Sequence, residues 1–167
     1  MRLKSFAEMR CPIAGALELV GDRWTLLLVR DLLLGHGRYD ALRLSTGIPD
    51  ATLTVRLKQM VHHGVVERVR YQDRPPRDEY RLTPKGLDLW KVSLALREWG
   101  DRWALTGLHA PLVETIDGET GRPLRLGLVD RETGMTVPDD RLRLRATPEA
   151  DDTVRSLLDR SSMVSRC

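Results

Sequence analysis

The feature that most constrains the fold is an amphipathic helical segment at 50–63 that is followed at once by strand-like segments. Its apolar side chains recur at helical spacing, and they are Leu53, Leu57, Met60 and Val61. Gly64 is typical of the residue just past a helix end, and Ser45-Thr-Gly47 separates this segment from a shorter helix at 38–44. Two helices joined by a tight glycine-containing turn indicate a helix-turn-helix, although the same outline also occurs as plain packing in other helical proteins.

The residues after this helix predict a β-hairpin. Residues 65–71 and 78–82 alternate apolar and charged side chains, which is the pattern of strands with one exposed face. The expected loop at 72–77 carries Arg74 and Arg77 around two prolines. A hairpin with a cationic tip directly after a helix-turn-helix has the outline of a wing that reaches along DNA. A solvated hairpin without a ligand is the alternative.

Three further helices complete the predicted domain. Residues 12–19 and 23–34 have helical periodicity, and the second segment is apolar enough to be the buried centre. Thr83-Pro84 provides an N-cap and a first-turn proline for a long helix that ends near Trp103. Apolar side chains cover more than half of its circumference, so part of that area needs a partner. A second copy of the chain and a folded-back C-terminal segment are the two alternatives.

The sequence changes character in its last third. Turn-forming sequences at 117–121 and 130–134 separate short alternating runs, which predicts two small hairpins. The predicted fold class is α+β, with a winged helix-turn-helix domain at 1–107 that ends in a long C-terminal dimerisation helix. A small β-hairpin appendage at 108–145 and a polar tail at 146–167 follow.

Composition limits the class of protein. Hydrophobic residues make up 41% and charged residues 31%, ordinary values for a globular chain, and no run approaches the ~20 apolar residues of a membrane span. The N-terminal residues lack the apolar core of a secretory signal, and two cysteines cannot form a disulfide framework. No Cys or His cluster has metal-ligand spacing. We therefore expect a cytoplasmic protein without a metal, a cofactor or a membrane partner.

Positive charge is concentrated in the first two-thirds of the chain. Residues 1–109 hold 18 Lys and Arg against 13 Asp and Glu, a net charge of +5. Residues 110–167 hold 9 against 11, a net charge of −2. Between residues 38 and 85 there are ten basic and six acidic side chains. This balance favours an anionic partner, with double-stranded DNA as the first candidate.

Nine short motifs, taken in order, carry a family resemblance. They are Cys11-Pro-Ile13, Gly21-Asp-Arg-Trp-Thr25, Arg38-Tyr-Asp-Ala-Leu42, Gly47-Ile48, Leu53-Thr-Val-Arg-Leu57, Gly64-Val-Val-Glu-Arg68, Arg74-Pro-Pro-Arg77, Tyr80-Arg-Leu-Thr-Pro-Lys-Gly86 and Trp99-Gly-Asp-Arg-Trp103. With these motifs, residues 11–103 resemble the HxlR-type winged helix-turn-helix transcriptional regulators, relatives of the multiple-antibiotic-resistance regulators. Each motif alone is weak, and their shared order over more than half of the chain makes the resemblance specific.

The resemblance implies a cytoplasmic bacterial repressor or activator that binds an inverted-repeat operator as a homodimer and has no catalytic activity. It implies that the helix at 50–63 enters the major groove, while the wing at 65–82 contacts flanking minor groove or phosphates. It also implies that the first helix and the long last helix of the domain build the dimer. The apolar positions expected in that interface are Ile13, Leu17, Trp90, Leu94, Trp99 and Trp103.

Helical geometry selects the candidate DNA contacts. The side of the helix at 50–63 opposite its buried stripe shows Ala51, Thr52, Val55, Lys58, Gln59 and His62. Those expected to read base edges, as the N-terminal half of a recognition helix does, are Thr52, Val55, Arg56 and Gln59. Thr54 lies nearer the helix side and is expected to bond phosphate. Arg56 lies at the edge of the buried stripe, so a salt bridge or a phosphate contact is its alternative.

Three other arginines and one departure from the family bear on DNA affinity. Arg38, at a helix start, and the wing residues Arg74 and Arg77 are expected to attract phosphates independently of base sequence. The family commonly has a small hydroxyl residue, acting as the helix cap, where Pro49 stands. We expect Asp50 to cap the helix instead, which also places an anion near the phosphates.

Cys11 is the candidate sensor residue. It precedes Pro12 at a helix start, where backbone N–H groups and the positive end of the helix dipole favour a thiolate. Some members of the family it resembles use the matching cysteine to sense electrophiles or oxidants, and others respond to small molecules. A structural cysteine at the dimer junction is the alternative. The expected signal is therefore either a small-molecule effector or an oxidant, and Cys167 is a further thiol.

Two other classes of function remain as alternatives. A winged-helix module can bind another protein without recognising specific DNA. An enzyme is less favoured, because no Ser/His/Asp order, glycine-rich phosphate loop or paired carboxylate site stands out. His62 and His63 do not indicate a metal site, because adjacent residues on a helix point about 100° apart.

Overall fold

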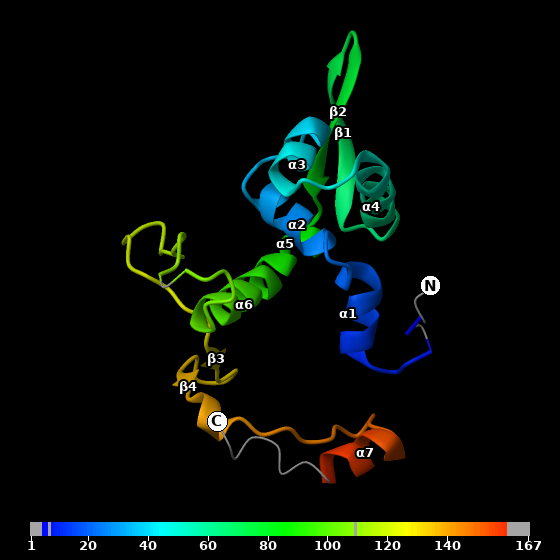
Figure 1. The fold of residues 1–167 in the computed structure, drawn as a ribbon. Helices are drawn as coiled ribbons and strands as arrows, with labels where there is room; N and C mark the ends of the chain where they lie inside the picture. Colours follow the sequence, from blue (N-terminus) through cyan, green and yellow to red (C-terminus); the bar gives the residue numbers. More distant parts are fainter. Residues whose placement is uncertain (1–4, 7, 109, 160–167) are drawn as a thin grey trace. The chain divides into compact units, whose positions relative to one another are not determined.

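The structure is a computed structural model that describes residues 5–6, 8–108 and 110–159. It divides into two compact units, Met1–Ala110 and Pro111–Cys167, and each is considered by itself. The first unit holds the helix-turn-helix and its hairpin, and the second holds the appendage and a short helix (Figure 1). Among the described residues, no helix combines the length and the hydropathy needed to cross a bilayer.

Four short helices form the N-terminal part of the first unit. They are α1 (Pro12–Val20), α2 (Thr25–Leu33), α3 (Tyr39–Thr46) and α4 (Asp50–His62). Gly47 adopts a left-handed conformation after α3 (φ 66°), and Gly64 does the same after α4 (φ 66°), so both predicted stop signals act as such. Asp22 fixes the start of α2, because its carboxylate accepts hydrogen bonds from the backbone N–H groups of Trp24 (2.8 Å) and Thr25 (3.2 Å).

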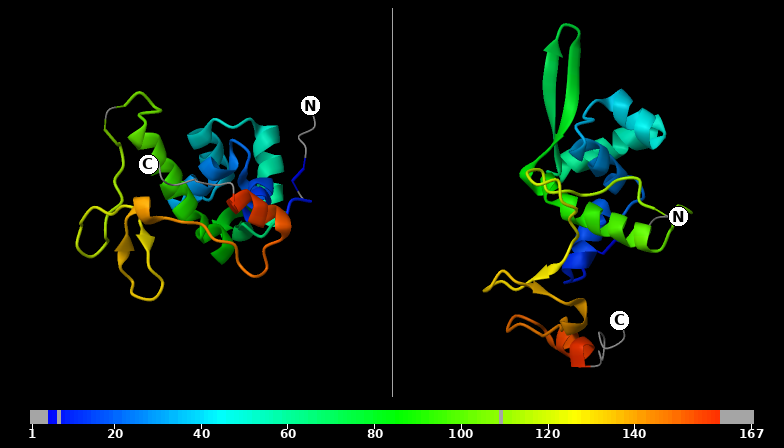
Figure 2. Two further views of the ribbon diagram at one scale, coloured as in Figure 1. Left: turned by 90° about the horizontal axis from the view of Figure 1, so that it is seen from below. Right: turned by 90° about the vertical axis from the view of Figure 1, so that its left-hand side faces the viewer.

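The predicted hairpin is present and its strands are longer than expected. β1 (Val66–Asp73) pairs antiparallel with β2 (Pro76–Leu82) from Val66–Leu82 to Asp73–Pro76, with a shift of register between Arg70 and Gln72. The expected loop at 72–77 is therefore wrong, and only Arg74-Pro75 turns the chain. Pro76 is tolerated in the ladder because it is the first residue of its strand. The hairpin projects beyond the helices of its unit in Figure 1 and in the right-hand view of Figure 2.

The predicted long helix is divided in two. α5 (Pro84–Leu87) and α6 (Leu89–Arg102) are separated by a single residue. Thr83 caps α5 as expected, because its Oγ1 accepts a hydrogen bond from the N–H of Gly86 at 3.2 Å. A glycine is required there, since a Cβ on Gly86 would lie 2.0 Å from the carbonyl oxygen of Val65. The start of α5 thus packs backbone to backbone against the chain that enters β1.

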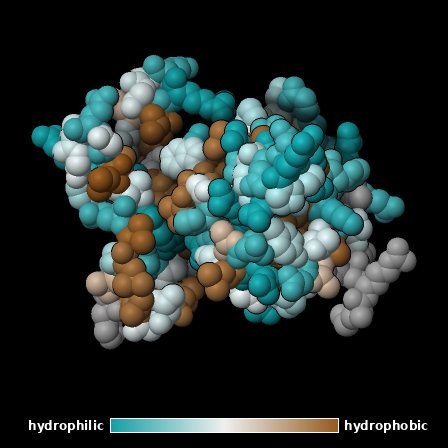
Figure 3. Space-filling model, turned by 90° about the horizontal axis from the view of Figure 1, so that it is seen from above, coloured by the Kyte–Doolittle hydropathy of each residue, from teal (hydrophilic) through white to brown (hydrophobic). Residues whose placement is uncertain are grey.

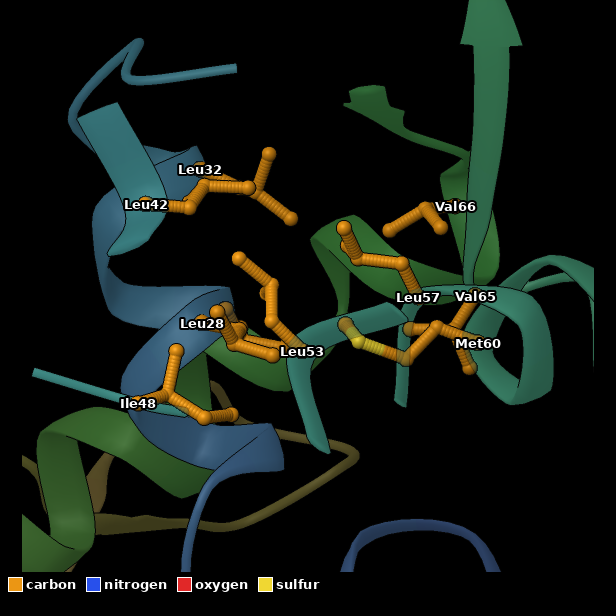
Figure 4. Close-up of a cluster of buried hydrophobic side chains, with 10 residues drawn as sticks. Leu28, Leu32, Leu42, Ile48, Leu53, Leu57, Met60, Val65 and Val66 are labelled. Carbon is orange, nitrogen blue, oxygen red and sulfur yellow. The ribbon is translucent and has the colours of Figure 1, made fainter. Parts of the chain in front are cut away.

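One hydrophobic core stabilises the first unit (Figure 4). Its buried members come from α2, α3, the turn, α4 and the start of the hairpin, and they are Leu28, Val29, Leu32, Leu42, Ile48, Leu53, Leu57, Met60, Val65 and Val66. Burial of each large apolar side chain contributes roughly 1.5–3 kcal/mol. α2 contributes Leu28, Val29 and Leu32 to this core, as its apolar composition predicts. α4 contributes its apolar stripe of Leu53, Leu57 and Met60, so the opposite face of α4 is on the outside.

The second unit contains two short antiparallel pairings. Its elements are β3 (Leu128–Val129), β4 (Thr136–Val137), the 3-10 helix η1 (Asp139–Arg141) and α7 (Asp152–Asp159). β3 pairs with β4, and Ile116 forms a single bridge with Pro123. In both pairings the two paired segments lie on either side of a predicted turn. The strands are much shorter than the alternating runs in the sequence suggested. None of the described side chains at 111–158 is buried, so too little apolar area is covered to extend the ladders.

The two turns of the second unit have the same hydrogen-bond pattern. Asp117 and Asp130 each accept the backbone N–H groups of the second and third residues that follow them, at 2.8–3.2 Å. Gly121 and Gly134 close the turns in left-handed conformations (φ 67° and 69°). The hydrogen bonds from these backbone N–H groups lower the pKa of both aspartates below the ordinary value. The similarity of the two segments in sequence is therefore also a similarity in structure.

Candidate nucleic-acid interface

The core orients α4 so that its polar face lies on the surface. Leu53, Leu57 and Met60 are buried on the inner side of the helix. The exposed candidates for DNA contact on the other side are Ala51, Thr54, Val55, Lys58 and Gln59, whereas Thr52 and Arg56 are half-buried. After Asp50, α4 carries no carboxylate. The outer face beyond the first helical residue can therefore approach a polyanion without charge repulsion.

Asp50 does not cap α4, contrary to expectation. Pro49 occupies the N-cap position without a side-chain bond, and Asp50 is the first helical residue. Its carboxylate accepts a hydrogen bond from Tyr39 Oη at 3.3 Å and lies 3.6 Å from Arg43 Nε, so its charge is partly compensated. Tyr39 Oη also lies 3.1 Å from the hydroxyl of Thr54, which therefore has a partner within the protein as well as an exposed position. These bonds tie α3 to the start of α4.

Arg56 forms the salt bridge that the sequence left as an alternative. Its Nε lies 3.3 Å from Asp22 Oδ1, and its side chain is 30% exposed. Its Nη1 donates a hydrogen bond to Gln59 Oε1 at 2.8 Å. The guanidinium thus joins the start of α2 to the exposed face of α4. Asp22 is a functional candidate that sequence analysis missed, because nothing local shows that it meets α4.

The hairpin carries more basic side chains than its predicted tip. Arg74 and Arg77 are exposed, as expected. Sequence analysis missed Arg68 and Arg70, which are also exposed and which both pair with the carboxylate of Asp78, with Arg70 Nε 3.0 Å from Oδ1. Their spacing of two residues in a predicted strand was the signal that could have found them, because such residues lie on one face. The wing therefore presents basic side chains along its length.

Asp78 organises part of this face. The hydrogen bond from Arg70 is the largest cause that holds the pKa of Asp78 below its ordinary value, and the bond from Arg68 acts in the same direction. A carboxylate that stays ionised keeps both guanidinium groups on one side of the hairpin. Seen from the hairpin end, the surface around the wing is mainly hydrophilic (Figure 3).

Arg38 lies against the hairpin. Its guanidinium carbon is 4.7 Å from the centre of the Tyr71 ring, a cation–π distance, and its backbone forms an isolated bridge with Glu79. The residue remains exposed. Arg38 was expected to contact phosphate from a helix start. It contacts the hairpin that also carries the wing arginines, and the sequence alone did not indicate this contact.

Apolar side chains are exposed on α1 and α6. Ile13 is 72% exposed and Leu17 is 47% exposed on α1. On α6, exposed side chains at spacings of four, three and four residues form a single stripe. This stripe consists of Val92, Leu96, Trp99 and Trp103. Two of the expected interface residues, Trp99 and Trp103, lie in the stripe, which also contains Val92 and Leu96.

Trp90 and Leu94 lie outside this stripe, on the opposite side of α6 by helical geometry. Leu94 is buried within its own chain at 9% exposure, although Trp90 is 44% exposed. The sequence could not separate these positions, because apolar side chains surround the helix and only the position of the core shows which side faces inward. The apolar side chains of α6 that are open to a partner are therefore those of the stripe and, on the other side of the helix, Trp90, but not Leu94.

Cys11 is half-buried at the N-cap of α1 and is a free thiol. Cys167 lies outside the described residues. His62 and His63 are stacked edge to face at the end of α4, with ring centres 5.1 Å apart. In the described parts of the chain, no group of three His, Cys, Asp or Glu side chains is arranged to hold a metal.

Comparison with known proteins gives these features a context. A family model described as the HxlR-like helix-turn-helix matches residues 19–107, just over half of the chain. An uncharacterised HTH-type transcriptional regulator of Mycobacterium tuberculosis is 45% identical over 91 residues, which are 54% of this chain and 58% of that relative. The match thus spans little more than half of the relative's own length.

Solved structures extend the likeness. The crystal structure of PA1607, a candidate transcription factor, is 30% identical with a TM-score of 0.73 and covers 86% of this chain and 100% of its own. That coverage reaches past the first unit into the second. The redox regulator HypR in its oxidised form is 31% identical with a TM-score of 0.52, over 55% of this chain and 96% of its own. Since the family model matches more than half of its residues, this chain belongs to the HxlR-like helix-turn-helix family.

Proposed function

We propose that the protein is a bacterial transcriptional regulator that binds double-stranded DNA. The observation that carries the proposal is an exposed helix face without carboxylates beside a hairpin that presents several arginines. The residues concerned are Lys58 on α4 and Arg68, Arg70, Arg74 and Arg77 on the hairpin. In this arrangement α4 lies in the major groove and the hairpin follows flanking phosphates or the minor groove. The name of the M. tuberculosis relative, an HTH-type transcriptional regulator, supports it.

The proposed contacts divide by chemistry. Exposed or half-exposed side chains on α4 that can meet base edges are Thr52, Val55 and Gln59, with Ala51 allowing close approach. Those that contact phosphates independently of base sequence are Arg38, Thr54, Lys58, Arg68, Arg70, Arg74 and Arg77. Arg56 has its guanidinium held by Asp22 and Gln59, so we assign it to positioning rather than to base contact.

We infer that the regulator is a homodimer through α1 and α6. α1 has nine residues, fewer than the ~12–15 that an isolated helix needs for stability, and it exposes Ile13 and Leu17. The stripe on α6 offers a second apolar surface in the same unit. A two-fold contact lets these surfaces of two copies cover each other. Such a dimer suits an inverted-repeat operator, with half-sites about one DNA turn apart, and repression by occupancy.

Enrichment of the full chain's targets from random duplex DNA tests the proposal. We expect the enriched sequence to be an inverted repeat. Fluorescence anisotropy, with a scrambled duplex as the control, should show that the protein binds this repeat at nanomolar concentration in ~200 mM salt. Equal binding to both duplexes that disappears in the same salt would contradict specific regulation. It would instead favour a winged-helix module whose partner is another protein.

A second candidate function is a thiol switch that controls this DNA binding. Cys11 is a half-buried free thiol at the start of α1, two residues from Ile13 of the inferred dimer contact, and the HypR structure is that of a redox regulator. Mild oxidation should then release DNA from the unmodified chain and not from Cys11→Ser. Release from both proteins would exclude Cys11, and no release from either would favour a small-molecule effector.

A further inference from the structure

The contacts of Gln59 show which way its amide faces. Arg56 Nη1 donates a hydrogen bond to Gln59 Oε1 at 2.8 Å. A guanidinium group has donors only, so the amide must turn its oxygen toward Arg56 and its NH₂ group away. The orientation of an amide is often ambiguous, but a partner without an acceptor removes that ambiguity. Because Gln59 is exposed, its NH₂ group is the part available to a ligand.

Arg56 is in turn anchored outside α4. Its Nε lies 3.3 Å from Asp22 Oδ1, and the two side chains are 30% and 15% exposed. The Asp22 carboxylate is fixed by hydrogen bonds from the N–H groups of Trp24 and Thr25, and Thr25 is fully buried. An ion pair that is largely shielded from water is screened by salt less than a surface pair. The guanidinium therefore holds a fixed place while it binds the amide.

We propose that the Asp22–Arg56 pair makes Gln59 a reader of guanine rather than adenine, an extension that rests on the proposed DNA binding. A free glutamine pairs with adenine through both ends of its amide, the oxygen accepting from N6 and the NH₂ group donating to N7. Here a cation occupies one of the two lone pairs of the oxygen, and its positive charge repels the amino hydrogens of adenine from the other. Guanine presents two acceptors, N7 and O6, to the major groove, and these suit a donating NH₂ group. Arg56 is thus a positioning residue that sets specificity without touching the base.

The test uses the full chain and begins with its enriched duplex. The base position whose preference is lost in Gln59→Ala is the position that Gln59 reads. We expect guanine there to be bound about tenfold more tightly than adenine by the unmodified protein. Replacement of that guanine by 7-deazaguanine, which lacks the N7 acceptor, should weaken binding, whereas inosine, which keeps N7 and O6, should not. This part of the test does not depend on whether an Arg56 variant folds.

The second arm releases the amide. In Arg56→Leu the Gln59 oxygen is free, so we expect the preference at that position to move from guanine to adenine. Arg125→Leu removes the same charge from an exposed position in the second unit and should keep the guanine preference. Circular dichroism of the variants confirms that they are folded before their binding is compared.

The outcomes separate this inference from the function on which it rests. A wild-type preference for adenine at the Gln59 position overturns the inference, as does a guanine preference that folded Arg56→Leu retains. If Gln59→Ala leaves every base preference unchanged, Gln59 is not a reader, and the inference fails although specific DNA binding stands. If the unmodified protein enriches no sequence, both proposals fail.

Discussion

At the scale of single residues, the basic side chains of the wing differ in what they bind within the protein. Arg68 and Arg70 share the carboxylate of Asp78, and the hydrogen bond from Arg70 is the largest cause that lowers the pKa of this carboxylate. Among the described residues, Arg77 forms no salt bridge. A guanidinium without an internal anion neutralises phosphate with its full charge, so we expect Arg77 to contribute more to DNA attraction than either paired arginine.

Arg77→Ala should weaken binding to all duplexes by a similar factor and make the dependence of log affinity on log salt shallower by roughly one unit. Anisotropy titrations at several salt concentrations measure both effects. Arg125→Ala, which removes a positive charge from the second unit, should leave the slope unchanged. A loss confined to the enriched duplex would instead make Arg77 a base reader.

Position 86 has no room for any side chain, so only glycine fits there. A Cβ there would lie 2.0 Å from Val65 O, so Gly86→Ala must displace α5 from the chain before β1. We expect a loss in the free energy of unfolding of on the order of 2 kcal/mol, measured by urea denaturation. Gly100→Ala is the matched control, because its Cβ would meet nothing within 4 Å apart from its chain neighbours and the nearby backbone of its own helix, and alanine favours helix over glycine by about 0.5–1 kcal/mol. Equal stability of Gly86→Ala and the unmodified chain would contradict the observed close packing.

At the scale of elements, the stripe on α6 is the surface whose role is most directly testable. Trp99 lies within it and is 57% exposed. If two copies pair here, Trp99→Glu buries an unpaired charge and should weaken dimerisation at least about tenfold, as measured by analytical ultracentrifugation. Lys91→Glu places the same new charge on an exposed position of α6 outside the stripe and should keep the dimer. A dimer that survives Trp99→Glu must use another face.

The two turns of the second unit should both lose their aspartate hydrogen bonds in acid. The pKa of Asp117 and that of Asp130 lie below the ordinary 3.8, because backbone N–H groups bond their carboxylates. A group with a folded pKa below its unfolded pKa contributes stability above the unfolded value and loses it as the pH falls through the folded value. Amide NMR signals of Gly121 and Gly134 should therefore change only below about pH 4.

A variant separates the two turns. Asp117→Asn retains an oxygen that accepts the same N–H groups but cannot titrate in this range. We expect the first turn of this variant to keep its NMR signals in acid while the second turn still opens. Opening of both turns together in the variant would show that acid acts elsewhere in the chain.

Local sequence patterns predicted the elements well and their contacts less well. Gly47 and Gly64 mark helix ends through their own backbone freedom and Thr83 marks a helix start through its hydroxyl, so those boundaries lie within two residues of the predicted ones. Whether Asp50 caps a helix or forms an ion pair with Arg43 depends on where α3 lies, and packing of the core determines the position of α3. The same holds for Asp22 beside Arg56, for Asp78 between two arginines, and for the inward side of α6. These are contacts across the fold, which a periodic pattern does not encode.

At the scale of the whole molecule, the two units are stabilised differently. Every described residue with a buried side chain lies in the first unit. In the second unit, backbone pairing and the two aspartate turns replace a core, and its described apolar side chains remain exposed or half-exposed. A segment of this size without a core gains little free energy from burial. The fold of the first unit should therefore not depend on the second.

Truncation after Ala110 tests this division. We expect residues 1–110 to unfold cooperatively at a temperature close to that of the full chain and to select the same DNA sequence, because α4, the wing and the stripe on α6 are all present. Circular dichroism and anisotropy measure the two properties, and a chain ending at Arg145 controls for loss of the last residues alone. If residues 1–110 are unfolded while the longer chain is folded, the second unit must cover apolar surface of the first. If they fold but bind DNA as a monomer, the second unit must contribute to pairing of the two copies.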